Sequence, residues 1–327
     1  MTSALPIGID VSKDQVDIFL TWQGESLQLE FSNDQQGFRQ FRKWLKKRKI
    51  TQAHLCMEAT GRYADALARF FYEAGYEVSV VNPRRIKAYA DSKLRRNKTD
   101  TADARIIEDF CRTQQPPLWQ PPAPEVEALQ MMTRHLDRLK RMRTQEINRL
   151  KSGISEPTVR AMIQEHIAYL DRAIQELEAK IQDHIDQHPE LKTSAELLQT
   201  IPGIGESTAA ILLAEIQDID RFDQASELAA YAGLSPRRRR SGSSVRGASH
   251  LSKMGNAVLR RALYFPALTA SRFNPGVRTL TERLAARGKQ RGVIQGAAMR
   301  KLLHIIFGVW KHRRPFNPAL AMAGTVS

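Results

Sequence analysis

The sequence contains little cysteine and no long apolar segment. Only two of its 327 residues are cysteines, Cys56 and Cys111, and they match no zinc-ligand spacing. Two thiols exclude a disulfide-rich secreted fold and favour a reducing compartment, with Cys56 as a small core residue. No apolar run approaches the roughly 20 residues that span a bilayer, and the opening Met-Thr-Ser-Ala-Leu-Pro lacks the basic and apolar parts of a secretory signal. We therefore expect a cytoplasmic protein with no membrane partner.

Acidic side chains are nearly absent from the carboxyl-terminal region that begins at Arg237. Between Arg237 and Arg314 there are 19 Lys or Arg residues and one acid, Glu282, whereas the remaining residues hold 31 basic and 34 acidic side chains. The net charge of +15 therefore belongs to this basic region alone. Because Lys and Arg displace condensed counterions from phosphates, the region is expected to bind a polyanion such as a nucleic acid. A solvated basic surface is the alternative.

The amino-terminal part alternates short apolar runs with helical patterns, which is typical of an α/β domain. These segments cover residues 17–22, 27–31, 38–45, 54–57, 63–73 and 76–81. Five prolines between residues 116 and 124 then form a linker that cannot continue a helix. The chain is long enough for about two or three domains with sizeable cores.

Two long amphipathic helices are predicted beyond the linker. In the second, apolar residues recur at spacings of four and three from Ile163 to Ile181, the period of a coiled-coil seam. The first is less regular, and Glu156-Pro157 separates the two, so we expect an antiparallel hairpin that serves as an arm or dimerisation element. Basic residues of the first helix either meet a phosphate backbone or form a solvated face. These are Arg134, Arg138, Lys140, Arg141 and Arg143.

A tight turn between two helices is predicted at Ile201-Pro202-Gly203-Ile204-Gly205. Glycine permits such a turn, and backbone N–H groups at the start of the next helix can then face a phosphate. The pattern resembles a helix-hairpin-helix DNA-binding motif. The same hairpin can also serve only for packing, so Gly203 and Gly205 are candidate contacts to nucleic acid.

Two acidic residues follow apolar runs in the first third of the chain. Asp10 comes directly after the run 5–9, within Ile-Gly-Ile-Asp-Val-Ser-Lys, and Glu58 closes the run 54–57, within Met-Glu-Ala-Thr-Gly. Short apolar runs of this kind predict buried strands. Both carboxylates are therefore expected at strand ends, although an Asp there often only caps a turn.

Asp100 and Asp103 lie three residues apart after Asn-Lys-Thr, which looks like a helix start. This spacing puts both carboxylates on one helical face, where acids also favour the helix dipole. Four carboxylates in the order Asp10, Glu58, Asp100 and Asp103 suit Mg²⁺, which prefers oxygen ligands. Two such ions would clamp a scissile phosphodiester.

The basic region also contains a serine motif. Gly233-Leu234-Ser235-Pro236 and the arginine run precede Ser-Gly-Ser-Ser-Val-Arg-Gly, which begins at Ser241. Small residues let a backbone approach a ligand, and a serine hydroxyl among guanidinium groups can attack a phosphorus whose charge they stabilise. A flexible basic loop has the same composition.

Together these motifs resemble the insertion-sequence 110 family of DEDD transposases, to which DNA invertases of the Piv type are similar. The resemblance covers nearly the whole chain, including Leu259-Arg260-Arg261-Ala262-Leu263-Tyr264 near its end. It implies a RuvC-like, RNase H-fold α/β domain at 1–115, like that of Holliday-junction resolvases. A proline-rich linker at 116–124, a coiled-coil helical hairpin at 125–190 and a mainly α transposase domain with a helix-hairpin-helix at 191–327 complete the implied organisation.

The resemblance also implies a site-specific DNA transposase of an insertion sequence that cleaves and rejoins strands. In this family a serine acts with the acidic tetrad, Asp10, Glu58, Asp100 and Asp103, and with Mg²⁺, for which we expect two ions. Matched residue by residue, that serine falls on Ser241, with Ser243 and Ser244 still open. The implied contacts to nucleic acid are Arg237, Arg238, Arg239, Arg240, Ser243, Ser244, Arg246, Lys253, Arg260, Arg261, Gly203 and Gly205.

The implied partners are donor and target DNA, bridged by a structured non-coding guide RNA, the bridge RNA. We expect a homo-oligomer, a tetramer formed as a dimer of dimers, because recombination exchanges four strands. Such a protein would work in the bacterial cytoplasm, associated with the nucleoid when active. One basic domain holding long stretches of phosphate agrees with sequence choice being left to base pairing.

Two other functions remain open. A metal-dependent, structure-selective nuclease of the Holliday-junction type would use the four carboxylates with water as nucleophile and need no serine. A binding protein without activity would need neither, and it is disfavoured because four carboxylates without metal would repel phosphate. A covalent adduct between protein and DNA distinguishes the three.

Overall fold

The computed structural model describes residues 4–59, 63–93, 100–237, 240–241, 245–246, 250–252 and 254–323. Only the backbone is described at residues 100–102, 237, 240–241, 245–246, 250 and 321–323. The chain divides into two compact units, Met1–Pro121 and Pro122–Ser327, so the division falls within the predicted proline-rich linker. No described helix is both long and apolar enough to cross a membrane.

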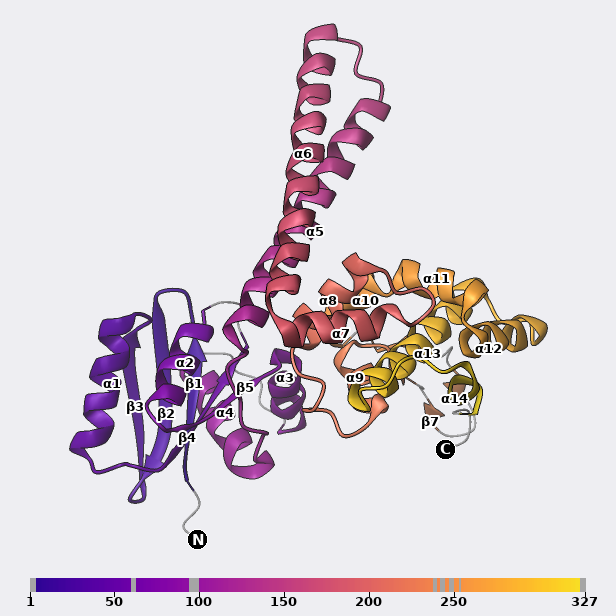
Figure 1. The fold of residues 1–327 in the computed structure, drawn as a ribbon. Coiled ribbons are helices and arrows are strands. Elements are labelled where there is room, and N and C mark those ends of the chain that lie inside the picture. The colour runs from indigo at the N-terminus through magenta and orange to yellow at the C-terminus, as the bar shows by residue number, and fades with distance from the viewer. Residues whose placement is uncertain are drawn as a thin grey trace. The chain divides into compact units, whose positions relative to one another are not determined.

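The amino-terminal unit is built on a five-stranded sheet in the order β3-β2-β1-β4-β5 (Figure 1). The strands are β1 Leu5–Val11, β2 Gln15–Trp22, β3 Glu25–Ser32, β4 Ala53–Glu58 and β5 Glu77–Val81. The first three strands pair antiparallel, whereas β4 runs parallel to both β1 and β5. The mixed α/β unit predicted from the apolar runs is therefore confirmed.

Helices cover both faces of this sheet. They are α1 Gln35–Lys47, α2 Asp65–Glu73, α3 Pro83–Ser92 and α4 Asp100–Gln114. One core lies between the sheet and α1 and α2, where Ile7 and Ile9 pack with Phe41 and Phe71. The opposite core lies under α4, and it includes both cysteines, which are buried. We refer to this second side as the α4 face of the sheet.

The carboxyl-terminal unit begins with the two long helices of the arm, α5 Pro124–Lys151 and α6 Pro157–Gln187. They lie side by side as a hairpin (Figure 1), and the predicted apolar seam of α6 is buried at Ile163, Leu170, Ile174 and Ile181. Shorter helices follow. These are α7 Pro189–Gln199, α8 Glu206–Ile216, α9 Ala225–Tyr231, α10 Ala257–Ala262, α11 Tyr264–Phe273, α12 Pro275–Ala286, α13 Arg291–Lys311 and α14 Pro318–Ala323.

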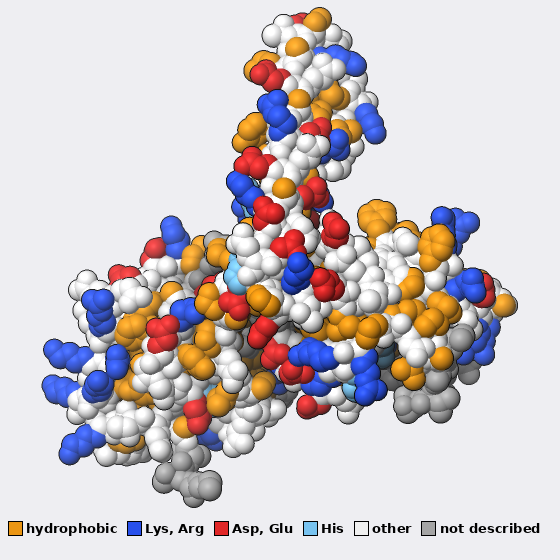
Figure 2. Space-filling model, in the orientation of Figure 1, with side chains coloured by type: hydrophobic (Ala, Val, Ile, Leu, Met, Phe, Trp, Pro, Cys, Tyr) orange, Lys and Arg blue, Asp and Glu red, His pale blue; other side chains and the backbone are white. Residues whose placement is uncertain are grey.

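Basic side chains of α5 pair with acids of the same unit. Lys140 lies 2.7 Å from Glu178, and Arg143 pairs with Asp171, both across to α6. Figure 2 shows Lys, Arg, Asp and Glu side chains interspersed along the hairpin. Arg134 and Arg141 are also ion-paired within the unit, whereas contact of this helix with a phosphate backbone stays a prediction.

Four strands of two residues each lie within and on either side of the serine motif. They are β6 Pro236–Arg237, β7 Arg240–Ser241, β8 Val245–Arg246 and β9 His250–Leu251. β6 pairs with β9 and β7 with β8, both antiparallel. The sequence does not predict these strands, because the segment is too polar and too rich in Gly and Ser to show the alternation of a half-buried strand.

Candidate active site

Asp10 and Glu58 lie next to each other at the carboxyl ends of two parallel strands. The register of β1 and β4 pairs Ile9 with Met57, so Asp10 and Glu58 are the next residues along each strand. Ile9 and Met57 are fully buried in the core beneath α1 and α2. Because successive side chains alternate across a strand, Asp10 and Glu58 belong to the α4 face. Both are partly buried.

Helix α4 crosses this face in close contact with β1. A Cβ atom at Gly8 would lie 2.1 Å from the carbonyl oxygen of Ala104, closer than any side chain allows. Further along α4, Arg112 lines a pocket together with Pro6, which precedes Gly8 on β1. The helix therefore runs antiparallel to β1, and its first turn lies at the strand end that carries Asp10.

Asp100 is the first residue of α4, and Asp103 is partly buried in its first turn. Residues 97–99, which look like a helix start in the sequence, and the side chain of Asp100 lie outside the described structure. Among the described side chains, no three of His, Cys, Asp or Glu are close enough to hold one metal ion. The fold thus brings four acidic positions to one edge of the sheet, while the described carboxylates do not converge on a single point.

A fifth carboxylate, Asp17, lies beside these positions and was not predicted. It is opposite Asp10 in the antiparallel register of β1 and β2, and directly opposite residues share one face of a sheet. Asp17 is partly buried, and Gln15 donates a hydrogen bond of 3.4 Å to it. Only strand pairing reveals this neighbour, because no sequence motif surrounds it.

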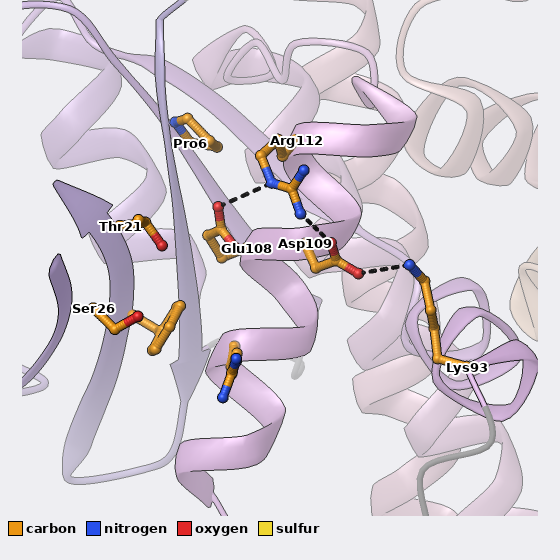
Figure 3. A pocket seen from close by; sticks show the side chains of 9 residues that line it. Pro6, Thr21, Ser26, Lys93, Glu108, Asp109 and Arg112 are labelled. Carbon is orange, nitrogen blue, oxygen red and sulfur yellow. Dashed lines mark hydrogen bonds and ion pairs between the residues drawn. The ribbon is translucent and has the colours of Figure 1, made fainter. Parts of the chain in front are cut away.

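A pocket of about 620 Å³ lies at the other end of α4 (Figure 3). Its acids are already paired: Glu108 is 3.5 Å from Arg112, and Asp109 is 3.1 Å from Lys93. Burial raises the pKa of Glu108, and the positive charge of Arg112 only partly offsets this effect. Its paired charges tie α3 and α4 together, so we assign this pocket a structural role.

The candidate serine lies in a short hairpin within the basic region. Ser241 pairs with Val245, and Arg240 pairs with Arg246, in the register of β7 and β8. The outer strand pair places Arg237 opposite His250. The backbone therefore brings two arginine positions together beside Ser241. Arg238, Arg239, Ser243, Ser244 and Lys253 lie outside the described residues.

Two predicted contacts to nucleic acid, Arg260 and Arg261, lie on α10 and have protein partners. Arg260 donates a hydrogen bond of 3.2 Å to the carbonyl of Ala232, and Arg261 donates one of 3.0 Å to Asp137 on α5. Because a guanidinium carries five N–H donors, each can still meet a phosphate.

The turn between α7 and α8 has the predicted position. Gly203 adopts φ +107°, and a Cβ atom there would lie 2.8 Å from the carbonyl oxygen of Pro266 on α11. Gly203 is therefore required for packing. A Cβ at Gly205, the N-cap of α8, would meet nothing within 4 Å in the described structure. Contact of this turn with DNA stays a prediction.

A buried glutamate that the sequence does not single out links the arm to the basic region. Glu215 on α8 is 1% exposed and accepts hydrogen bonds from Arg134 on α5, at 2.7 and 3.0 Å. It also accepts one of 2.6 Å from Asn256, which caps α10. This network fixes α5, α8 and α10 relative to one another. The guanidinium group of Arg134 is thus engaged in a contact within the protein.

Comparisons with known proteins match both units. Residues 7–156 match the transposase family of IS110-type DEDD enzymes, and residues 195–282 match the transposase family of IS116, IS110 and IS902. A pilin gene-inverting protein of Moraxella bovis is 36% identical over 319 residues, which cover 95% of this chain and 97% of the relative. The transposase for insertion sequence element IS1328 of Yersinia enterocolitica is 26% identical over 299 residues, covering 80% and 83%.

Proposed function

The chain belongs to the IS110 family of transposases, and from this premise we propose that it is a site-specific recombinase that cuts and rejoins DNA strands of an insertion sequence. Members of the family are transposases, so the chain is an enzyme of DNA strand transfer. The observation that supports cutting and rejoining by this chain is the position of Asp10 and Glu58 on adjacent parallel strands, at the sheet edge where α4 begins.

The proposed catalytic domain is a RuvC-like RNase H fold at residues 1–115. Its support is the strand order β3-β2-β1-β4-β5, in which the first three strands pair antiparallel and β4 runs parallel to both β1 and β5. Helix α4 crosses the α4 face of this sheet at β1. The linker at 116–124, the coiled-coil arm at 125–190 and the transposase domain at 191–327 complete the proposed organisation.

We propose that Asp10, Glu58, Asp100 and Asp103 hold the divalent metal ions that DEDD transposases use. The donor chemistry fits, because carboxylate oxygens are the ligands that Mg²⁺ prefers, and the four positions share one edge and face of the sheet. Bound Mg²⁺ would stabilise the negative charge that develops on the scissile phosphate. Without metal, the same carboxylates would repel that phosphate.

Ser241 is the proposed nucleophile. Its hydroxyl oxygen would attack the phosphorus and form a phosphoserine bond, while the bond from phosphorus to the leaving deoxyribose oxygen breaks and that oxygen takes up a proton. Attack by the hydroxyl of another strand on the phosphoserine then rejoins DNA and returns the serine. The support is the register of the β7–β8 hairpin, which places the cross-strand pair Arg240 and Arg246 next to Ser241 along the backbone, within a basic region whose guanidinium groups suit a phosphorane charge.

The proposed partners are donor DNA, target DNA and a guide RNA, held by a tetramer. The charge map supports a long polyanion, since the basic region holds 19 Lys or Arg against one acid. Base pairing would then choose the target, as it does in other RNA-guided systems. A tetramer would supply one active site for each of the four strands exchanged.

A plasmid assay tests this function. The plasmid carries the coding sequence with its native flanking DNA, and sequencing across the flanks detects new junctions made in cells. Wild-type protein should give precise recombined junctions, and Asp10→Ala should give none. Breaks without rejoined strands would favour the nuclease that uses water. RNA that copurifies with the protein and maps to the flanks would support the guide RNA.

A further inference from the structure

An exposed groove of about 820 Å³ lies between α10, α11 and α13 in the carboxyl-terminal unit. We call it the α11 groove. Its apolar wall comes from Tyr264, Phe265 and Leu268 of α11, and its basic wall includes Arg260 and Arg291. Figure 2 shows hydrophobic side chains exposed in the region of α11, with Lys or Arg side chains nearby.

The aromatic rings of the groove face solvent although the same helix has a well-buried side. Phe265 is 74% exposed and Tyr264 is 46% exposed, whereas Ala267 and Ala270 are fully buried. The two rings are 5.3 Å apart and nearly perpendicular, at 87°. Gln295 of α13 donates a hydrogen bond of 2.7 Å to the carbonyl of Tyr264, which holds this end of α11 in place. A clustered apolar surface of this kind indicates a binding site.

The charge around the groove decides between partners. Among the residues described as lining it, three are arginines, Arg260, Arg261 and Arg291, and none is acidic. A second copy of the chain docking through the same surface would bring arginines against arginines, because a twofold interface meets itself. An anionic partner with flat apolar faces fits both walls. Unpaired nucleic acid has this chemistry, since its bases stack on aromatic rings while its phosphates meet basic side chains.

We propose that the α11 groove binds single-stranded DNA, with an unpaired base stacked on Phe265 or Tyr264 and adjacent phosphates beside Arg260 and Arg291. This inference rests on the proposed function, because strand exchange requires DNA whose bases are no longer paired. Duplex DNA hides its base faces, so it can meet the arginines but not the rings. The groove would thus hold a strand during exchange.

Fluorescence anisotropy with the full chain tests the groove, using a short labelled DNA strand and the duplex of the same sequence. Phe265→Ala should weaken single-strand binding by about 5- to 150-fold, the effect of losing one stacked base, and leave duplex binding nearly unchanged. Phe265→Trp should preserve binding. The matched control is Phe273→Ala, since Phe273 is 68% exposed on the same helix but does not line the groove.

Salt dependence separates stacking from charge. Phe265→Ala should leave the slope of log affinity against log salt unchanged, whereas Arg291→Gln should reduce it by roughly 0.7 for one lost phosphate of a single strand. A strand containing 5-iododeoxyuridine should also crosslink to the peptide with Tyr264 and Phe265 in the unmodified chain. That last result does not depend on any variant folding.

Several outcomes would overturn the proposal. One is an equal loss of single-strand affinity for Phe265→Ala and Phe273→Ala. Another is a loss of affinity by Phe265→Ala that is as large for the duplex as for the single strand. The third is a loss of affinity by Phe265→Ala that is larger for an RNA strand than for the DNA strand of the same sequence. A lower mass of Phe265→Ala in sedimentation would assign the groove to contact between copies instead. None of these assays needs catalysis. If wild-type protein recombines no plasmid but Phe265 still governs single-strand binding, the proposed function fails and the groove stands.

Discussion

Gly8 lies directly beneath Ala104, so closely that a Cβ atom on Gly8 would come within 2.1 Å of the Ala104 carbonyl oxygen. This contact lets α4 cross β1 at backbone distance. It also sets where the first turn of α4, with Asp100 and Asp103, stands relative to Asp10 on the same strand. A residue without chemistry of its own thereby determines the spacing of the acidic positions.

The first prediction follows from that contact. Gly8→Ala should lower the free energy of unfolding of the amino-terminal unit by at least about 2 kcal/mol, because the added methyl meets backbone that has no room to move. DNA cleavage should fall as well. Urea unfolding measures the change, and the control is Gly308→Ala on α13, where a Cβ would meet no described atom within 4 Å beyond the backbone of its own helix. A Gly8→Ala protein of wild-type stability would show that α4 does not approach β1 in this way.

The second prediction concerns the acidic positions. Replacing Asp10, Glu58 or Asp103 by Ala should reduce strand cleavage by more than about 100-fold, since even partners of metal ligands contribute 10- to 100-fold. DNA binding should persist or strengthen, because each change removes negative charge near the phosphate. The matched control is Asp14→Ala, which removes an exposed acid close to Asp10 in sequence. Full cleavage by any tetrad variant in Mg²⁺ would remove that residue from the ligand set.

The third prediction concerns the distribution of charge. A fragment covering residues 122–327 should bind duplex DNA with a steep salt dependence, with a log–log slope of roughly −0.9 for each neutralised phosphate. The fragment covering residues 1–121 should bind weakly. Each fragment keeps its own buried core. Titration at several salt concentrations gives both slopes, and equal slopes would contradict an assignment of the polyanion site to the basic region.

The fourth prediction concerns pH and His304 on α13. Burial, aided by Arg300 and Lys301, lowers the pKa of His304 to about 4, and its Nε2 is buried without a hydrogen-bond partner among the described atoms. As pH falls, His304 is therefore protonated in the unfolded chain before it is protonated in the folded one, near its ordinary pKa of about 6.5. The free energy of unfolding should fall by about 1–2 kcal/mol as pH drops from 6.5 to 4. This is less than the full difference between the two pKa values implies, because the His304 ring is partly exposed.

Urea unfolding of the 122–327 fragment across this pH range measures the effect. His304→Phe should remove that part of the pH dependence, whereas His312→Gln, at an exposed position, should retain it. The same slope in the wild type and in His304→Phe would show that other groups control acid stability.

The sequence predicts the amino-terminal unit well because local patterns determine its parts. The runs 27–31 and 54–57 become β3 and β4 with boundaries shifted by one or two residues, and Asp10 and Glu58 lie at strand ends as expected. Apolar alternation is a property of a short segment and needs no partner. The seam from Ile163 to Ile181 is predictable because its helical spacing of four and three is likewise visible within one continuous segment.

Other features depend on pairing between distant segments. Asp17 becomes a neighbour of Asp10 only through the register of β1 and β2, and Glu215 becomes a link only when α5 and α10 pack around it. Each is an ordinary acid in its local sequence. The hairpin that contains Ser241 has strands of two residues, too short for any periodic pattern.

The most direct test of the central claim is mass spectrometry of the protein trapped on a suicide DNA substrate, which breaks but cannot rejoin. A serine nucleophile conserves the energy of the broken bond in a phosphoserine, whereas water releases it. Wild-type protein should carry DNA on Ser241, and both Ser241→Ala and Asp10→Ala should bind the substrate without an adduct. An adduct on Ser243 or Ser244 would move the nucleophile within the motif. Cleavage by Ser241→Ala with no adduct on any residue would contradict the recombinase and establish a nuclease that uses water.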